Sequence, residues 1–101
     1  MRGIRRTSGR LELRGLPCSL GEVVNISAGG VVVDGRPPTA PRVPLELGEG
    51  GDRIAVRAEA AWTVRLRRGR ARTGYRFIDP PPDLLPRLLG VRLPESRQRM
   101  L

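Results

Sequence analysis

Apolar and polar residues alternate most regularly between residues 53 and 67 of this chain. The apolar side chains share one parity: Ile54, Val56, Ala58, Ala60, Trp62, Val64 and Leu66. Polar side chains dominate the other parity, and only Ala55 and Ala61 interrupt them. A period of two over so many positions predicts one long β-strand with a buried side and a solvent-facing side. Such a strand must curve or contain a bulge, as strands of small barrels do.

Shorter strand-like segments flank this long one on both sides. We expect strands at residues 10–14, 19–26, 30–34, 42–47 and 71–78. Glycine and proline mark the turns or loops that separate them, at residues 15–17, 35–41, 48–51 and 68–70. Pro44 falls inside one expected strand, and proline has no N–H to donate to a neighbouring strand. That strand is therefore expected at a sheet edge or a bulge.

The β region is followed by a pattern typical of a short helix. Three prolines at residues 80–82 end the strands, and Asp83 is a suitable N-cap. The apolar stripe of the helix consists of Leu84, Leu85, Leu88 and Leu89. Gly90 is expected to end it. The predicted fold class is all-β with a C-terminal helix, in which about six antiparallel strands close into a barrel that the helix plugs.

The length of the chain indicates the number of domains, and its charge indicates the kind of partner. The 101 residues suit one domain, which we divide into an N-terminal arginine segment (residues 1–9), a barrel with its helix (10–93) and a polar tail (94–101). All 19 basic residues are arginine, and they outnumber 10 acidic residues to give a net charge of +9. This excess favours an anionic partner. The planar guanidinium forks also suit phosphate and guanine.

Several residue types that support catalysis or metal binding are absent or single. The chain has no histidine, and Cys18 is its only cysteine, so we expect no disulfide, no metal site, no cofactor and no enzymatic activity. The first residues contain no apolar stretch typical of a secretion signal, and no run approaches ~18 apolar residues. We therefore expect a cytoplasmic protein without membrane insertion.

An arginine cluster near the N-terminus is the first candidate for ligand binding. Arg6 and Arg10 form the ends of an RxxxR string, and Arg5 precedes it. Guanidinium groups can donate paired hydrogen bonds to phosphate oxygens or to guanine O6 and N7. A solvated basic tail is the alternative interpretation. Because the segment is polar and contains glycine, we expect residues 1–9 to be loosely ordered without a ligand.

A second candidate lies at the close of an expected strand. Asn25, Ser27 and Gly30 form the string [DN]xSxxG. Asn25 and Ser27 point to the same face if the strand persists, so both can contact one ligand. Gly30 permits a positive φ or the close approach of a ligand to the backbone. The alternative is an ordinary strand end with serine and asparagine turn chemistry.

In this order, and followed by an all-β pattern, the two strings resemble the ligand motif of the PilZ domain, the bacterial receptor module for cyclic di-GMP. Residues 58–62 and 74–79 also resemble the family's later strands. The resemblance implies a six-stranded barrel followed by a helix, with the arginines on one side of the ligand and Asn25, Ser27 and Gly30 on the other. It also places an aromatic or other large residue near the bound guanine. Trp62 is therefore a further candidate, although its parity also suits the core.

The resemblance predicts a receptor or adaptor that binds cyclic di-GMP, orders its arginine segment and signals to an unidentified protein effector, as a monomer or homodimer. Two other functions remain open: a PilZ-like adaptor that binds a protein and no nucleotide, and a small basic barrel that binds RNA or single-stranded DNA. Three aromatic residues make a poor stacking platform, which disfavours nucleic acid. Five arginines between residues 65 and 72 are expected to be a solvated face and turn.

Overall fold

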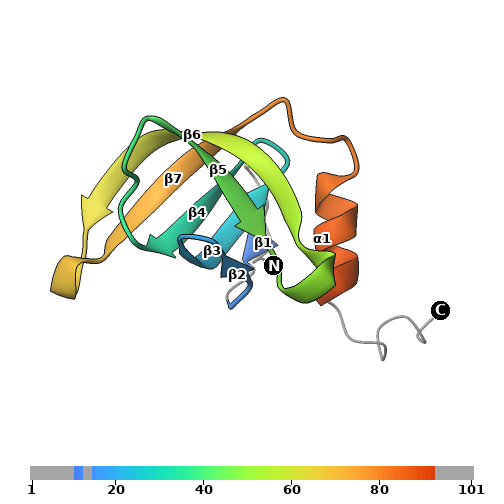
Figure 1. Cartoon of the computed structure of the whole chain (residues 1–101), viewed down its shortest axis with the longest axis horizontal. Helices are drawn as coiled ribbons and strands as arrows, with labels where there is room; N and C mark the ends of the chain where they lie inside the picture. Colours follow the sequence, from blue (N-terminus) through green and yellow to red (C-terminus); the bar gives the residue numbers. More distant parts are fainter. Residues whose placement is uncertain (1–10, 13–14, 93–101) are drawn as a thin grey trace, which may run out of the picture.

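The computed structural model describes residues 11–12 and 15–92 of the chain. Within these residues the chain forms β-strands, two 3₁₀ turns and one α-helix (Figure 1). The elements are β1 (Leu11–Glu12), β2 (Pro17–Cys18), β3 (Gly21–Ser27), β4 (Gly30–Gly35), β5 (Arg42–Leu47), η1 (Gly50–Asp52), β6 (Ile54–Arg65), η2 (Arg67–Gly69), β7 (Ala71–Ile78) and α1 (Leu84–Arg92). The predicted strands at residues 42–47 and 71–78 are confirmed at both ends.

Six antiparallel strands close into a barrel, as the sequence predicted. Neighbouring strands follow the order β3–β4–β7–β6–β5–β2, and β2 pairs again with β3. The short β1 pairs with the far end of β3, on the edge where β2 pairs with its beginning. Of the expected first strand (residues 10–14), the described part is β1. The expected turn at residues 15–17 is too long by one residue, because β2 already begins at Pro17; Gly15, with a φ of 88°, lies in this turn.

The predicted edge at Pro44 is also confirmed. Along its length β5 pairs with β6, and among the described residues its other side pairs with β2 only at Leu47. Pro44 therefore lies where most of one strand side has no neighbour in the ladder. A residue without an N–H costs little at such a place.

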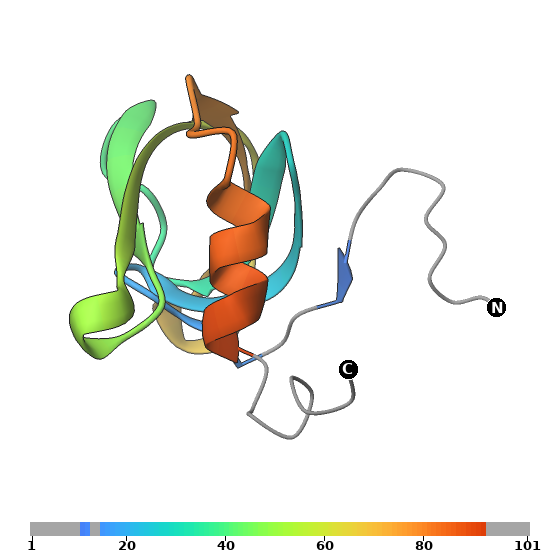
Figure 2. The same cartoon turned by 90° about the vertical axis from the view of Figure 1, so that its right-hand side faces the viewer.

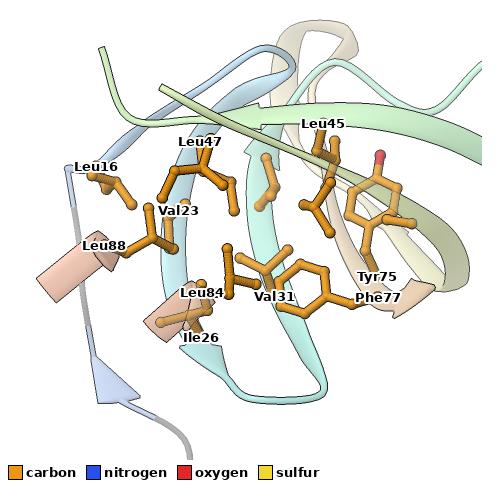
Figure 3. Close-up of a cluster of buried hydrophobic side chains, with 14 residues drawn as sticks. Leu16, Val23, Ile26, Val31, Leu45, Leu47, Tyr75, Phe77, Leu84 and Leu88 are labelled. Carbon is orange, nitrogen blue, oxygen red and sulfur yellow. The ribbon is translucent and has the colours of Figure 1, made fainter. Parts of the chain in front are cut away.

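The buried side of the barrel is aliphatic, with two aromatic rings at one end. Val23, Ile26, Leu45 and Leu47 are almost completely buried beside Tyr75 (Figure 3). Inward positions of β4, β6 and β7, together with Leu16 and two leucines of α1, complete the cluster. Removal of this apolar surface from water provides the main stabilisation of so small a domain.

The C-terminal helix closes one end of the barrel. Figure 2 shows α1 lying across the opening, and Leu84 and Leu88 extend from it into the core. The predicted helix and its buried stripe are confirmed at these two leucines. Its predicted end at Gly90 is wrong, because α1 continues to Arg92. Glycine in a helix costs only about 1 kcal/mol, which the burial of Leu88 two residues earlier outweighs.

The long strand β6 contains the predicted irregularity, and this bulge changes which side chains are buried. Ala60 pairs with Tyr75, but Trp62 pairs with Gly74, so Ala61 is an extra residue on β6. Such a bulge exchanges the two faces of the strand beyond it. Ala58 before the bulge is buried, whereas Trp62 and Val64 after it are 46% and 54% exposed. The expected core position of Trp62 is therefore wrong.

Candidate functional site

The outward side chains of four neighbouring strands form one continuous surface, here called the outer face. One row crosses it from Asn25 on β3 through Val32 on β4 and Gly74 on β7 to Trp62 on β6. The next row toward the Ser27–Gly30 turn contains Ser27, Gly30, Arg76 and Glu59. Both polar motif residues and Trp62 thus belong to the same side of the barrel.

A bulge in β3 places the motif on this face. The pairing of β3 with β4 shifts between Val23 and Asn25, and Val23 and Ile26 both belong to the core cluster. Asn25 and Ser27, on either side of buried Ile26, therefore face outward and are half-buried. The predicted common face of these two side chains is confirmed, because β-strand geometry persists through Ser27.

The Ser27 hydroxyl takes part in the turn that joins β3 to β4. It accepts a hydrogen bond from the Gly29 N–H at 3.3 Å and donates to the Gly30 carbonyl at 3.5 Å. These local bonds are the turn chemistry expected as the alternative to ligand binding. They also fix the direction of the hydroxyl oxygen at the end of β3.

Packing within the barrel explains why residue 30 is a glycine. A Cβ atom at this position would lie 2.3 Å from the Tyr75 carbonyl oxygen on the neighbouring strand β7. Its φ is not positive, so the close approach that requires glycine here is that of β7. Neither the positive φ nor the approach of a ligand expected from the sequence is needed to explain this glycine.

Trp62 lies over a second glycine of the outer face. A Cβ atom on Gly74 would lie 2.3 Å from the indole Nε1, so the ring covers the backbone of β7 where that strand has no side chain. Val32 beyond it is 7% exposed and outside the core cluster. Trp62 thus protects the sheet from outside while it keeps an accessible surface.

Two ion pairs that the sequence did not predict lie beside the motif. Arg76 donates to Glu59 at 2.6 Å, and this hydrogen bond lowers the pKa of the Glu59 carboxyl. Arg72 forms a bidentate pair with Asp34 at 2.6 and 2.8 Å. Their partners lie on strands that are distant in sequence, so only the strand register could have revealed them.

The arginines of the first motif, Arg5, Arg6 and Arg10, lie outside the described residues. The chain segment that follows them is described, and its position is informative. Leu11 pairs with Ile26, and Glu12 pairs with Asn25. The strand that directly follows Arg10 therefore runs along the strand that carries the second motif.

Other kinds of site find little support within the described residues. No group of three or more potential metal ligands occurs among them. Burial raises the pKa of the Cys18 thiol, which reduces its thiolate fraction and hence its nucleophilicity. In the described part of the chain, no helix is long and apolar enough to span a bilayer.

Comparison with protein-family models, with curated proteins and with solved structures finds no match for this chain.

Proposed function

We propose that this protein is a cyclic di-GMP receptor of the PilZ type, without catalytic activity. The observation that supports it is the arrangement of the second motif. Asn25 and Ser27 lie together on the outer face, on the strand with which β1 pairs. Because β1 directly follows Arg10 in the chain, the described strand next to the first half of the motif pairs with the strand that carries the second half.

The two halves offer complementary chemistry to a guanine dinucleotide. Asn25 can donate and accept hydrogen bonds at a guanine edge, and Ser27 can add an acceptor beside it. The guanidinium groups of Arg5, Arg6 and Arg10 suit the two phosphates and the O6 and N7 atoms of guanine. Cyclic di-GMP carries both kinds of group, so it can connect the arginine segment to the barrel.

Trp62 defines how far a ligand must extend to contact the whole site. Three strand spacings separate it from Asn25, which is about 14 Å along the curved outer face. A single base beside Asn25 does not span this distance. A ligand with two bases can place one near Asn25 and bring the other toward the indole ring.

Replacing Asn25 by alanine tests the barrel half of the site without changing the net charge. We expect Asn25→Ala to weaken cyclic di-GMP binding by about fivefold or more, because the base loses a buried hydrogen-bond partner. Ser27→Ala should act in the same direction. Isothermal titration calorimetry measures the effect, with Thr39→Ala as a neutral control on an exposed loop.

GTP, cyclic di-AMP and a short RNA serve as competing ligands in the same titrations. A shaped site binds cyclic di-GMP most tightly and distinguishes Asn25→Ala from Thr39→Ala. If all anions bind alike and affinity follows only the salt concentration, the protein is instead a general polyanion binder.

Ligand binding should also order the N-terminal segment, which is how we propose that the receptor changes its surface. Hydrogen exchange is expected to slow at residues 4–10 when cyclic di-GMP is added. The β6 ladder should exchange equally slowly in both states, since its pairing with β5 and β7 does not involve the ligand. Equal protection of residues 4–10 with and without ligand would contradict this mechanism.

One observation favours an adaptor that binds a protein and no nucleotide. Trp62, Val64 and Leu66 are exposed at alternate positions of β6 and just beyond it. Exposed apolar residues grouped in this way are typical of protein contact surfaces. If cyclic di-GMP fails to bind, this surface becomes the principal candidate site.

A further inference from the structure

A basic hollow lies at the end of the barrel away from the Ser27–Gly30 turn. It has a volume of about 410 Å³ and is bordered by Arg36, Arg68 and Arg70. Arg36 follows β4, whereas the other two belong to the turn that connects β6 and β7. Three residue steps of β4 separate Val32, in the nearer row of the outer face, from Gly35 beside the hollow, or about 10 Å. None of the residues that line the hollow belongs to the two rows of the outer face.

Two glycines create the space. The backbones of β3 and β4 approach closely at Gly21 and Gly35, where a Cβ on Gly35 would lie 1.9 Å from the Leu20 carbonyl oxygen. No side chain can project from either residue, so the strand ends form an open floor. Arg36 is held at its border, because its guanidinium donates to the Ser19 carbonyl at 3.0 Å.

Among the described residues, no carboxylate compensates the charge around the hollow. None of the described residues that line it is acidic, and within the described part of the chain none of the three arginines has a carboxylate partner. Like charges placed around one space repel each other in the free protein. An anion bound between them removes that repulsion and accepts hydrogen bonds from each fork.

Arg68 has an unfavourable backbone conformation for its residue type. Its φ and ψ are 60° and 38°, and the following Gly69 also has a positive φ of 75°. Two successive positive φ values define the hairpin turn in which asparagine followed by glycine is preferred. Arginine costs more in this left-handed conformation. Stability alone therefore does not explain arginine at this position, whereas an anion site does.

We infer that Arg36, Arg68 and Arg70 form a binding site for a compact phosphate-bearing anion, either a soluble pyrophosphate-type ligand or a phospholipid headgroup. The site is independent of cyclic di-GMP binding and stands whether or not that proposal is correct. From the sequence alone, Arg68 and Arg70 were expected to belong to a solvated turn. The fold places Arg36, from the loop after β4, beside Arg68 and Arg70, and the three arginines together border one hollow.

The test compares two charge-matched variants of the full-length protein at 150 mM salt. Arg68→Asn removes a lining guanidinium, whereas Arg67→Asn removes the same charge from the neighbouring residue, which does not line the hollow. Titration with inorganic pyrophosphate should show about tenfold weaker binding for Arg68→Asn and Arg70→Gln. Arg67→Asn should change the affinity less than about threefold. Equal losses in Arg67→Asn and Arg68→Asn would overturn the proposal.

Thermal unfolding measures the conformational cost of Arg68 separately from its charge, because both variants remove one positive charge. Because asparagine tolerates the left-handed conformation, Arg68→Asn should raise Tm by about 2–6 °C relative to Arg67→Asn.

Sedimentation with phosphatidylglycerol vesicles distinguishes a phospholipid headgroup from a soluble phosphate-bearing ligand. If the protein binds vesicles and Arg68→Asn does not, the ligand is a lipid headgroup. If the protein binds pyrophosphate but no vesicles, the ligand is soluble. Binding to neither would overturn the proposed site.

Discussion

Arg6→Ala and Arg10→Ala should each lower the affinity for cyclic di-GMP by roughly 10- to 100-fold. Each arginine offers hydrogen bonds to a charged or strongly accepting ligand group, and such bonds contribute about 1.5–3 kcal/mol. The loss of affinity should exceed that in Asn25→Ala, because replacing an arginine also removes a positive charge beside the phosphates. Calorimetric titration of the full-length variants measures the change.

Arg53→Ala is the matched control for these two variants. It removes the same unit of charge from an exposed position, where Arg53 contacts Glu46 at 3.3 Å. Binding should change little in this variant, since the charge lies away from the outer-face rows. Unchanged binding in both Arg6→Ala and Arg10→Ala would remove the RxxxR string from the site, even if cyclic di-GMP binds elsewhere.

Leu88→Ala should be the most destabilising single substitution proposed for this barrel, at about 2–5 kcal/mol. Leu88 is 0% exposed and extends from α1 into the core (Figure 3). Its removal leaves a cavity at the end of the barrel that the helix closes. Chemical denaturation with fluorescence detection measures the free energy of unfolding.

Two other variants separate the loss of packing from a general effect on the helix. Leu88→Met keeps nearly the same volume and should cost less than about 1.5 kcal/mol. Arg87→Ala alters an exposed neighbour on α1 and should change stability by about 0.5 kcal/mol or less. Similar destabilisation in Arg87→Ala and Leu88→Ala would contradict the role of burial, because alanine favours the helix at both positions and only Leu88 is buried.

Most of the barrel could be predicted from local patterns. Alternation of Ile54, Val56 and Ala58 predicted the start of β6, and β-branched residues predicted β4. These predictions succeed because a strand with one buried side must repeat every two residues, whatever its partners. Asp83, Leu84 and Leu88 likewise predicted the helix, since its cap and buried stripe are local in sequence.

The alternation concealed the bulge at Ala61, and this caused the wrong prediction for Trp62. Apolar parity continues through Trp62, Val64 and Leu66, but one extra residue on β6 turns the first two of them outward. Alanines on both sides of the shift carry too little polarity to reveal it. Only pairing with β7 determines the face of the strand beyond that point.

The sequence by itself determined an all-β chain with a C-terminal helix, a strongly basic charge and a common face for Asn25 and Ser27. These features depend on local periodicity and composition. Tertiary structure alone decided that Gly30 accommodates Tyr75, that Trp62 covers Gly74, and that Arg36 joins Arg68 and Arg70 around one hollow. Each of these contacts joins residues far apart in the chain, and barrel closure and strand register set their distances.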